Sequence, residues 1–267
     1  MTDEPPPSAT RARTPRVARL VHLAWRQATV ALVVEETPDA HTLVLDVPGW
    51  PGSVAGQHVD VRLTAPDGYQ ATRSYSLASG PGERAALTVQ EVPGGEVSPF
   101  LVRDITVGET VELRGPIGGY FVWAGARRPL LLVGGGSGLA PLRAMWRAAD
   151  RTRPVVVVAS VTTPARLLYA VELAERVAAG DVWATVHLSR ADVPDDAERA
   201  GTPLQALTLR AGRVASTTVT QALTACGGTE ADPGVFVCGP TTFVEAMIHL
   251  LAGAGLDPRS IRAERFG

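Results

Sequence analysis

Residues 73–79, Arg-Ser-Tyr-Ser-Leu-Ala-Ser, combine side chains that suit a phosphate-bearing aromatic ligand. On a β-strand, alternation sends Arg73 and Tyr75 to one face and leaves Ser76 to offer its hydroxyl or amide at the edge. The guanidinium group can hold a phosphate through two parallel hydrogen bonds, and the phenol ring can lie flat on a cofactor such as a flavin. The same residues also suit an ordinary barrel strand with a surface arginine, because polar strands of this kind are common.

Two glycine-bearing segments follow apolar runs. Residues 134–141, Gly-Gly-Gly-Ser-Gly-Leu-Ala-Pro, open a predicted helix, where backbone amides and the helix N-terminus can receive an anion. Leu139 stands where the third glycine of the dinucleotide fingerprint would be, and a tight strand-to-helix turn is the alternative interpretation. Residues 238–242, Cys-Gly-Pro-Thr-Thr, end the last apolar run, and they also suit a small buried thiol before a turn.

The composition excludes several classes of protein. At 267 residues the chain is long enough for two domains, and its net charge of −2 points to neither nucleic acid nor an anionic membrane as a partner. All 25 basic residues are arginine, so a phosphate-binding cation must be arginine or histidine. Cys226 and Cys238 are the only cysteines, which excludes a four-cysteine iron–sulfur cluster within this sequence and argues against a disulfide scaffold. No metal site is predicted.

Two domains after an N-terminal tail are predicted. Residues 1–24, with four prolines and four arginines, are expected to form a disordered basic tail, although such a stretch could also contact an acidic partner. In residues 25–124, strand-like runs at 29–36, 42–47 and 58–63, separated by turn residues, predict an antiparallel β-barrel with a helical break at 98–102. No apolar run reaches the length of a membrane span and the start is not a signal peptide, so a cytoplasmic location is expected.

The pattern changes in residues 125–267. Apolar runs at 130–133, 155–159, 183–188 and 235–238 alternate with helical patterns from residue 141 onward and at about 167–178 and 243–252. Buried strands that alternate with helices predict a doubly wound parallel α/β sheet. Ligands of such sheets bind at the carboxyl ends of the strands, which is where both glycine segments fall.

The order of the motifs carries more information than any one of them. The segments RSYS (73–76), GGEVS (94–98), GGGSGLAP (134–141) and CGPTT (238–242) precede a closing ERFG (264–267). Together they resemble the ferredoxin–NADP reductase family over roughly residues 25–267. The resemblance implies an FAD-binding barrel domain at 25–124 and an NAD(P)H-binding domain at 125–267, in a stand-alone monomer without an iron–sulfur module.

The resemblance also implies a flavin site. Arg73 would hold the flavin pyrophosphate, Tyr75 would stack on the isoalloxazine, and Ser76 would donate or accept a hydrogen bond near the flavin N5. Phe266 would cover the opposite face of the ring and move aside for the nicotinamide. The flavin-binding residues implied in this way are Arg73, Ser74, Tyr75, Ser76, Glu96, Val97, Ser98, Ser137 and Phe266.

A nicotinamide site is implied beside it. Cys238 would lie close to the nicotinamide ring, and Glu264 would order the hydride-transfer site through Ser76 and Cys238, which makes these three the implied catalytic residues. The implied coenzyme-binding residues are Gly135, Gly136, Gly138, Pro141, Ser189, Arg190, Arg213, Cys238, Gly239, Pro240 and Thr241.

The residues favour NADPH over NADH. Ser189 and Arg190 follow the third apolar run, where phosphate-specific members of the family carry such a pair, and Arg213 or Arg199 could assist. Thr162 stands where many relatives have arginine, and a Ser-Arg pair also suits a solvated turn, so NADH remains the alternative.

The resemblance implies that hydride passes from NADPH to FAD and that electrons then leave to a separate acceptor. FAD is favoured over FMN because FMN-using relatives usually carry a four-cysteine ferredoxin module. A ferredoxin, a flavodoxin or another redox protein is the expected partner. The alternatives are the reductase component of an oxygenase system, an NAD(P)H:flavin reductase that releases reduced flavin, and a non-catalytic flavin-binding subunit, against which the glycine segments argue.

Overall fold

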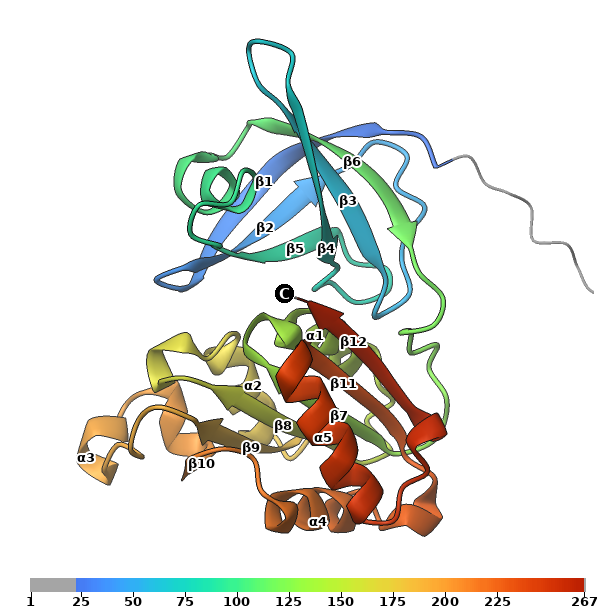
Figure 1. The fold of residues 1–267 in the computed structure, drawn as a ribbon, viewed down its shortest axis with the longest axis vertical. Coiled ribbons are helices and arrows are strands. Elements are labelled where there is room, and N and C mark those ends of the chain that lie inside the picture. Colours follow the sequence, from blue (N-terminus) through green and yellow to red (C-terminus); the bar gives the residue numbers. More distant parts are fainter. Residues whose placement is uncertain (1–22, 267) are drawn as a thin grey trace, which may run out of the picture.

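The computed structural model describes residues 23–266, so the tail expected at 1–24 lies outside the described residues as far as residue 22. Two sheets stand one above the other along the long axis (Figure 1). The first sheet is antiparallel in the order β4-β3-β6-β1-β2-β5, and a bridge between Leu77 and Leu87 joins its two end strands into a barrel. Its strands are β1 Arg26–Thr37, β2 Ala40–Asp46, β3 His58–Thr64, β4 Gln70–Ser76, β5 Ala85–Gln90 and β6 Thr110–Ile117.

The barrel is filled by alternate apolar side chains of its strands and is capped by a short helical segment. Leu43, Leu87 and Leu113 are almost fully buried inside it, together with Leu101 from the π-helical turn η1 Phe100–Asp104. The helical break expected at 98–102 is therefore present.

The second sheet is parallel in the order β10-β9-β8-β7-β11-β12. Its strands are β7 Leu130–Gly135, β8 Val155–Val161, β9 Trp183–Leu188, β10 Thr208–Ala211, β11 Gly234–Pro240 and β12 Ile261–Phe266. The helices are α1 Leu139–Ala148, α2 Ala170–Ala178, α3 Asp196–Arg199, α4 Ser216–Ala225 and α5 Thr241–Gly253.

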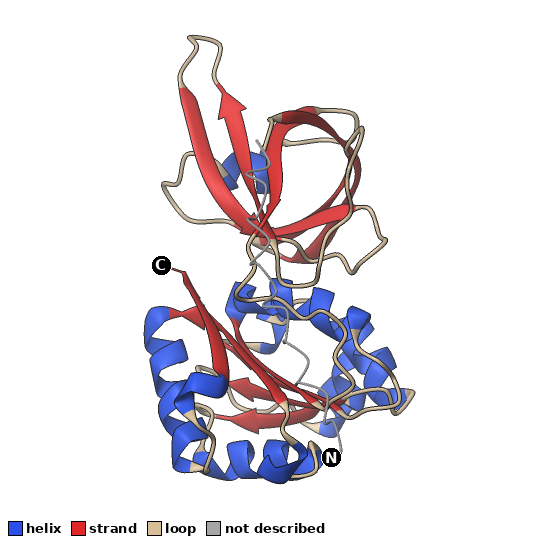
Figure 2. Ribbon diagram, turned by 90° about the vertical axis from the view of Figure 1, so that its right-hand side faces the viewer, coloured by secondary structure: helices blue, strands red, loops and turns tan. Residues whose placement is uncertain are grey.

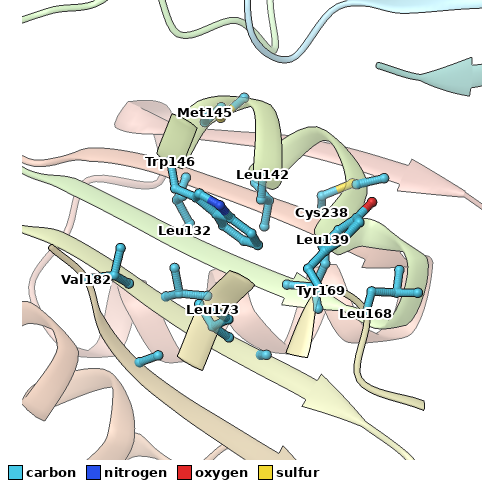
Figure 3. Close-up of a cluster of buried hydrophobic side chains, with 14 of the residues drawn as sticks. Leu132, Leu139, Leu142, Met145, Trp146, Leu168, Tyr169, Leu173, Val182 and Cys238 are labelled. Carbon is cyan, nitrogen blue, oxygen red and sulfur yellow. The ribbon is translucent and has the colours of Figure 1, made fainter. Parts of the chain in front are cut away.

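Helices cover both faces of this sheet (Figure 2). Leu130 and Leu132 pack toward α1 and α2, whereas Leu131 and Val133 pack toward α4 and α5, because successive residues of a strand point to opposite faces. Figure 3 shows the first of these clusters, in which Trp146 of α1 lies beside the sheet. The predicted fold class, an antiparallel barrel followed by a doubly wound parallel sheet, is confirmed.

Two helix starts differ from the prediction. The helix expected at about 167–178 begins only at Ala170, because Leu167, Leu168 and Tyr169 all turn into the core in succession and Tyr169 adopts a left-handed backbone (φ 58°). The helix expected from Pro141 onward begins two residues earlier, at Leu139, after a 3₁₀ turn at Gly136–Gly138.

The chain reverses its direction of travel across the second sheet between β7 and β11. From β7 it proceeds outward through β8, β9 and β10, and it then returns to β11 and β12 on the other side. Such a switch point leaves a crevice at the carboxyl ends of the two central strands. Both glycine segments lie at this point.

The two sheets share one apolar cluster. Phe121 and Trp123, which follow the barrel, pack edge-on against Phe236 of β11 with ring centroids 5.3 Å and 6.1 Å apart. No helix within residues 23–266 is both long enough and apolar enough to cross a membrane.

Candidate active site

A cavity of about 1120 Å³ lies at the carboxyl ends of the second sheet. Thr37 and Gln90 of the barrel also line it, so it extends to the boundary between the two sheets. The cavity brings together seven residues that the sequence singled out, namely Gly135, Gly136, Ser137, Ser189, Arg190, Arg213 and Pro240.

Five of the predicted coenzyme residues do not line this cavity, namely Gly138, Pro141, Cys238, Gly239 and Thr241. A Cβ on Gly138 would lie 2.3 Å from the carbonyl oxygen of Cys238, and one on Gly239 would lie 3.2 Å from the Cα of Gly135. These glycines therefore let the two glycine segments pack backbone against backbone. Pro141 is buried within α1, and Thr241 begins α5 beside Thr242, which does line the cavity.

Cys238 and Glu264 are partners in register on the parallel strands β11 and β12. The Cys238 Sγ lies 4.0 Å from Glu264 Oε2 and can donate a weak hydrogen bond to it. Burial, with the Glu264 charge second, raises the pKa of the Cys238 thiol well above its ordinary value, and burial also raises the pKa of Glu264. Cys238 is therefore a neutral thiol rather than a nucleophilic thiolate. Among the described contacts Glu264 reaches Cys238 and not Ser76.

The arginines expected to bind phosphate separate into two groups. Arg190 and Arg213 line the cavity after β9 and β10, whereas Arg199 donates hydrogen bonds to the carbonyl oxygens of Leu204 (3.0 Å) and Leu207 (2.8 Å) and so holds a loop. Arg199 does not line the cavity, so the suggestion that it assists in phosphate binding stays an unsupported prediction.

Sequence reasoning missed Arg166, which also lines the cavity. It lies in the turn after β8, and it forms an ion pair with Asp39 of the barrel. Its position in the sequence could have revealed it, because the turns that follow parallel strands all lie along the same edge of the sheet.

On the barrel, Arg73 and Tyr75 occupy the strand β4, as predicted. Arg73 Nη2 donates to Glu96 Oε2 (2.7 Å), and the Tyr69 hydroxyl donates to the other oxygen of the same carboxylate (2.8 Å). These hydrogen bonds from Tyr69 and Arg73 hold the pKa of Glu96 below its usual value. Burial raises the pKa of the half-buried Tyr75 to about 12, so this ring is neutral. Ser76 is half-buried at the end of β4.

Two hydroxyls that the sequence assigned to the flavin have partners within the protein. Ser74 Oγ donates to Asp60 Oδ1 (2.6 Å), on the face of β4 opposite Arg73, as alternation requires. Ser98 Oγ accepts from the Val92 amide (3.0 Å), and Val97 is buried in the barrel core. The Ser74 side chain is thus turned away from Arg73 and Tyr75, and contact of the Ser98 hydroxyl with a pyrophosphate stays a prediction.

Phe266 ends β12, where it pairs in register with Pro240 of the cavity wall, and its side chain is 38% exposed. The C-terminal end of β12 points toward the lower ends of β4 and β5 (Figure 1). An exposed aromatic ring at the end of a strand, near the predicted flavin strand, is in a position to cover a ring bound there.

The residues present fit a flavin and a dinucleotide. Arg73 is 53% exposed and keeps N–H donors beyond those that Glu96 uses, while a Cβ placed on Gly136 (φ +54°) would meet no atom closer than 4.0 Å. Residues 28–122 match the oxidoreductase FAD-binding domain family, and residues 132–249 match the oxidoreductase NAD-binding domain family. The chain belongs to the ferredoxin–NADP reductase family. Its cofactors are accordingly FAD and a nicotinamide dinucleotide.

Solved structures support the same fold. A ferredoxin NADP⁺ reductase from Neisseria gonorrhoeae with bound FAD and NADP has a TM-score of 0.69, covering 90% of this chain and 98% of that one at 18% identity. The Amycolatopsis cytochrome P450 reductase GcoB has a TM-score of 0.73, covering 91% of this chain and 70% of that one at 27% identity.

Sequence relatives of this reductase-family chain include components of oxygenase systems. It is 28% identical over 199 residues to the ferredoxin–NAD(P)⁺ reductase component of the naphthalene 1,2-dioxygenase system of Pseudomonas putida, covering 73% of this chain and 56% of that protein. It is 30% identical over 222 residues to the propane 2-monooxygenase reductase component of Rhodococcus jostii, covering 79% of this chain and 55% of that protein. The chain spans about half the length of these curated relatives.

Proposed function

We propose that the protein oxidises NADPH through bound FAD and passes the electrons to a separate redox protein of an oxygenase system. The observation that carries the proposal is the cavity in which the glycine segments of β7 and β11 meet Ser189, Arg190 and Arg213 below the barrel. Hydride transfer between nicotinamide and flavin, and its division into single electrons, is chemistry that the two cofactors supply when bound.

On the barrel, this chain's own residues hold and orient a flavin. The exposed fork of Arg73 and the backbone amides at the start of the η1 turn offer donors to a pyrophosphate. The neutral ring of Tyr75 offers a flat face, and Ser76 a hydroxyl at the strand end. On the other side, the neutral Cys238 thiol adds no charge of its own, and its weak hydrogen bond to Glu264 orients it.

Arg190 and Arg213 support the choice of NADPH. Both residues line the cavity after β9 and β10, on the side away from β11, where their guanidinium groups would hold a ribose 2′-phosphate if the adenosine bound there. Among residues 23–266 neither has a carboxylate within ion-pair distance. A ligand phosphate would therefore not have to displace an internal partner.

Anaerobic mixing with NADPH and with NADH tests the proposal. The flavin absorbance should bleach, with a higher kcat/KM for NADPH, and Arg190→Ala should lower the NADPH value about 10- to 100-fold while leaving the NADH value near wild type. Arg151→Ala, at an exposed arginine that pairs with Asp181 outside the cavity, is the matched control. Equal values for the two coenzymes in the wild type would overturn the NADPH assignment, and no bleaching with either would overturn the reductase proposal.

The acceptor is tested by reoxidation of the bleached protein. Relatives that are reductase components of dioxygenase and monooxygenase systems favour an oxygenase component or its ferredoxin as the acceptor. A general ferredoxin or flavodoxin reductase is the second candidate, favoured by the family itself. Reoxidation by an iron–sulfur protein in stoichiometric amounts supports either of these functions, whereas loss of the flavin on gel filtration and reoxidation only by free flavin would indicate a flavin reductase.

A further inference from the structure

Arg166 is a cavity residue with a partner on the other sheet. It ends the 3₁₀ turn η3 Pro164–Arg166 after β8, and it lines the cavity together with Thr162. Its guanidinium forms an ion pair with Asp39, in the turn between β1 and β2. The Arg166 side chain is 44% exposed, so some of its five N–H donors remain available to a second partner.

Asp39 is held in place independently of Arg166. The Thr37 hydroxyl donates to its Oδ1 (2.9 Å) and the Gln90 side-chain amide donates to its Oδ2 (3.0 Å). Partial burial raises the pKa of Asp39, but the hydrogen bonds from Gln90 and Thr37 and the charge of Arg166 outweigh this and lower it. The carboxylate is therefore ionised and would stay anchored if Arg166 left it.

The position of Arg166 along the sheet edge distinguishes it from the other cavity arginines. In the order β10-β9-β8-β7-β11, it follows β8, directly beside the glycine segment that follows β7. Gln90, which holds Asp39, has its Oε1 4.0 Å from the Cβ position of Gly136. Arg190 follows β9 and Arg213 follows β10. Their strands therefore lie one and two positions farther from the β7 glycines than the strand of Arg166 does, at about 4.8 Å per strand.

This order matches the order of groups in a nicotinamide dinucleotide. A coenzyme with its nicotinamide near Pro240 of β11 and its adenosine ribose near Arg190 has its pyrophosphate between them, beside the β7 glycines and Arg166. The pyrophosphate is common to NADH and NADPH, whereas the 2′-phosphate is not.

We propose that Arg166 binds the coenzyme pyrophosphate and that Asp39 competes with that pyrophosphate for the guanidinium. The proposal rests on the proposed function, since it assigns a role in the same cavity. When a dinucleotide binds, Arg166 exchanges a carboxylate for phosphate oxygens, while Thr37 and Gln90 retain Asp39. The two members of one ion pair then act on coenzyme affinity in opposite directions.

Binding of NAD⁺ and NADP⁺ to the flavin-loaded protein, measured by titration calorimetry, tests this exchange. Arg166→Ala should weaken both coenzymes about tenfold and leave their affinity ratio unchanged, since it removes a charge-assisted contact that both share. Asp39→Asn should tighten both about two- to fivefold, because it frees Arg166 and removes a negative charge near the phosphates. Arg190→Ala, by contrast, should weaken NADP⁺ alone.

Glu83→Gln is the matched control. Glu83 pairs with Arg147 (2.9 Å), a second ion pair between the barrel side and the second sheet, but it does not line the cavity. The proposal is supported if Glu83→Gln leaves coenzyme affinity unchanged while Arg166→Ala weakens it and Asp39→Asn strengthens it. Weaker binding in both Arg166→Ala and Asp39→Asn would overturn the proposal, because the ion pair would then serve only to hold the two sheets in place. An effect of Arg166→Ala on NADP⁺ alone would also overturn it. If the wild type bound neither dinucleotide, the proposed function itself would fail and this proposal with it.

Discussion

Glu264 is a half-buried carboxylate that the fold holds against the Cys238 thiol at 4.0 Å. Burial raises its pKa, and among residues 23–266 no arginine offsets the loss of water. A carboxyl whose pKa is higher in the folded than in the unfolded chain destabilises the folded state once it ionises. Ionised Glu264 therefore lowers the stability of the folded chain, and its expected role in ordering the hydride-transfer site stays a prediction.

Glu264→Gln should therefore make the protein more stable at alkaline pH. Below pH about 4.5, its unfolded value, the carboxyl is protonated in both states and the variant gains nothing; the gain grows as pH rises through the raised folded pKa. Thermal unfolding at pH 5 and pH 8 should show a melting temperature a few degrees above wild type at pH 8 and a smaller difference at pH 5. Glu245→Gln, at an exposed carboxylate of α5, is the control, and a variant less stable than wild type at pH 8 would contradict the argument.

Single residues of the site were predictable where a short motif marks them, and their partners were not. The sequence located Arg73, Cys238 and Arg190 because each lies in a short motif within a strand pattern or directly after one. The pairing of Arg73 with Glu96, and of Arg166 with Asp39, joins segments far apart in the chain. Such contacts follow from how the sheets fold together, which periodicity does not encode.

At the scale of elements, the strands of the second sheet that are buried on both faces were the ones that the sequence pattern predicted. The strands β7, β8, β9 and β11 were predicted because both of their faces are covered, which requires continuous apolar runs. The edge strands β10 and β12 carry charged residues on partly exposed faces, so their pattern was not recognised. The helix α4 was missed because threonines, which favour strands and caps, occupy much of it. The barrel strands β5 and β6 also went unassigned.

The contact between the glycine segments of β7 and β11 predicts a strong effect of one methyl group. Gly138→Ala would place its Cβ 2.3 Å from the Cys238 carbonyl oxygen and 2.5 Å from its carbon, and backbone atoms of a central strand cannot move aside easily. We expect a loss of about 1–3 kcal/mol in the free energy of unfolding, measured with urea, and weaker coenzyme binding because β7 and β11 must separate.

Gly253→Ala is the control for that substitution. Gly253 ends α5 with no atom within 4 Å of its Cβ position, so alanine should be neutral or stabilise the helix by up to about 1 kcal/mol. Wild-type stability and coenzyme affinity in Gly138→Ala would mean that the two strands have room to move, contrary to the packing described.

At the scale of the whole molecule, a closed ring of hydrogen bonds joins the barrel to the second sheet. The Tyr169 hydroxyl donates to Thr88 Oγ1 (2.5 Å), Thr88 and Thr42 share a hydrogen bond (2.7 Å), and Thr42 donates to Glu36 Oε1 (2.8 Å). The ring closes because the other Glu36 oxygen accepts from the Tyr169 amide (3.3 Å). Burial raises the pKa of Tyr169, which keeps the phenol a donor. Tyr169, whose backbone is left-handed, contributes both its amide and its hydroxyl to this ring, and no sequence pattern indicated that conformation.

The ring predicts that Tyr169 and Thr88 are coupled in stability. Tyr169→Phe removes one buried hydrogen bond but leaves Thr88 with Thr42 as a partner, so it should cost about 1 kcal/mol. Thr88→Val leaves the buried phenol without an acceptor and should cost more, about 1–3 kcal/mol. The double variant should lose less unfolding free energy than the sum of the two single losses. Thr88→Val leaves the Tyr169 hydroxyl without an acceptor, but Tyr169→Phe removes that hydroxyl.

Urea unfolding of the four proteins measures this coupling across the boundary between the sheets. Tyr120→Phe is the control, since the Tyr120 hydroxyl reaches the Ile261 carbonyl only at 3.5 Å from an exposed position, and its loss should change the unfolding free energy little. Additive costs in the double variant would mean that the hydroxyls of Tyr169 and Thr88 are satisfied separately, and the ring would then not couple the barrel to the second sheet.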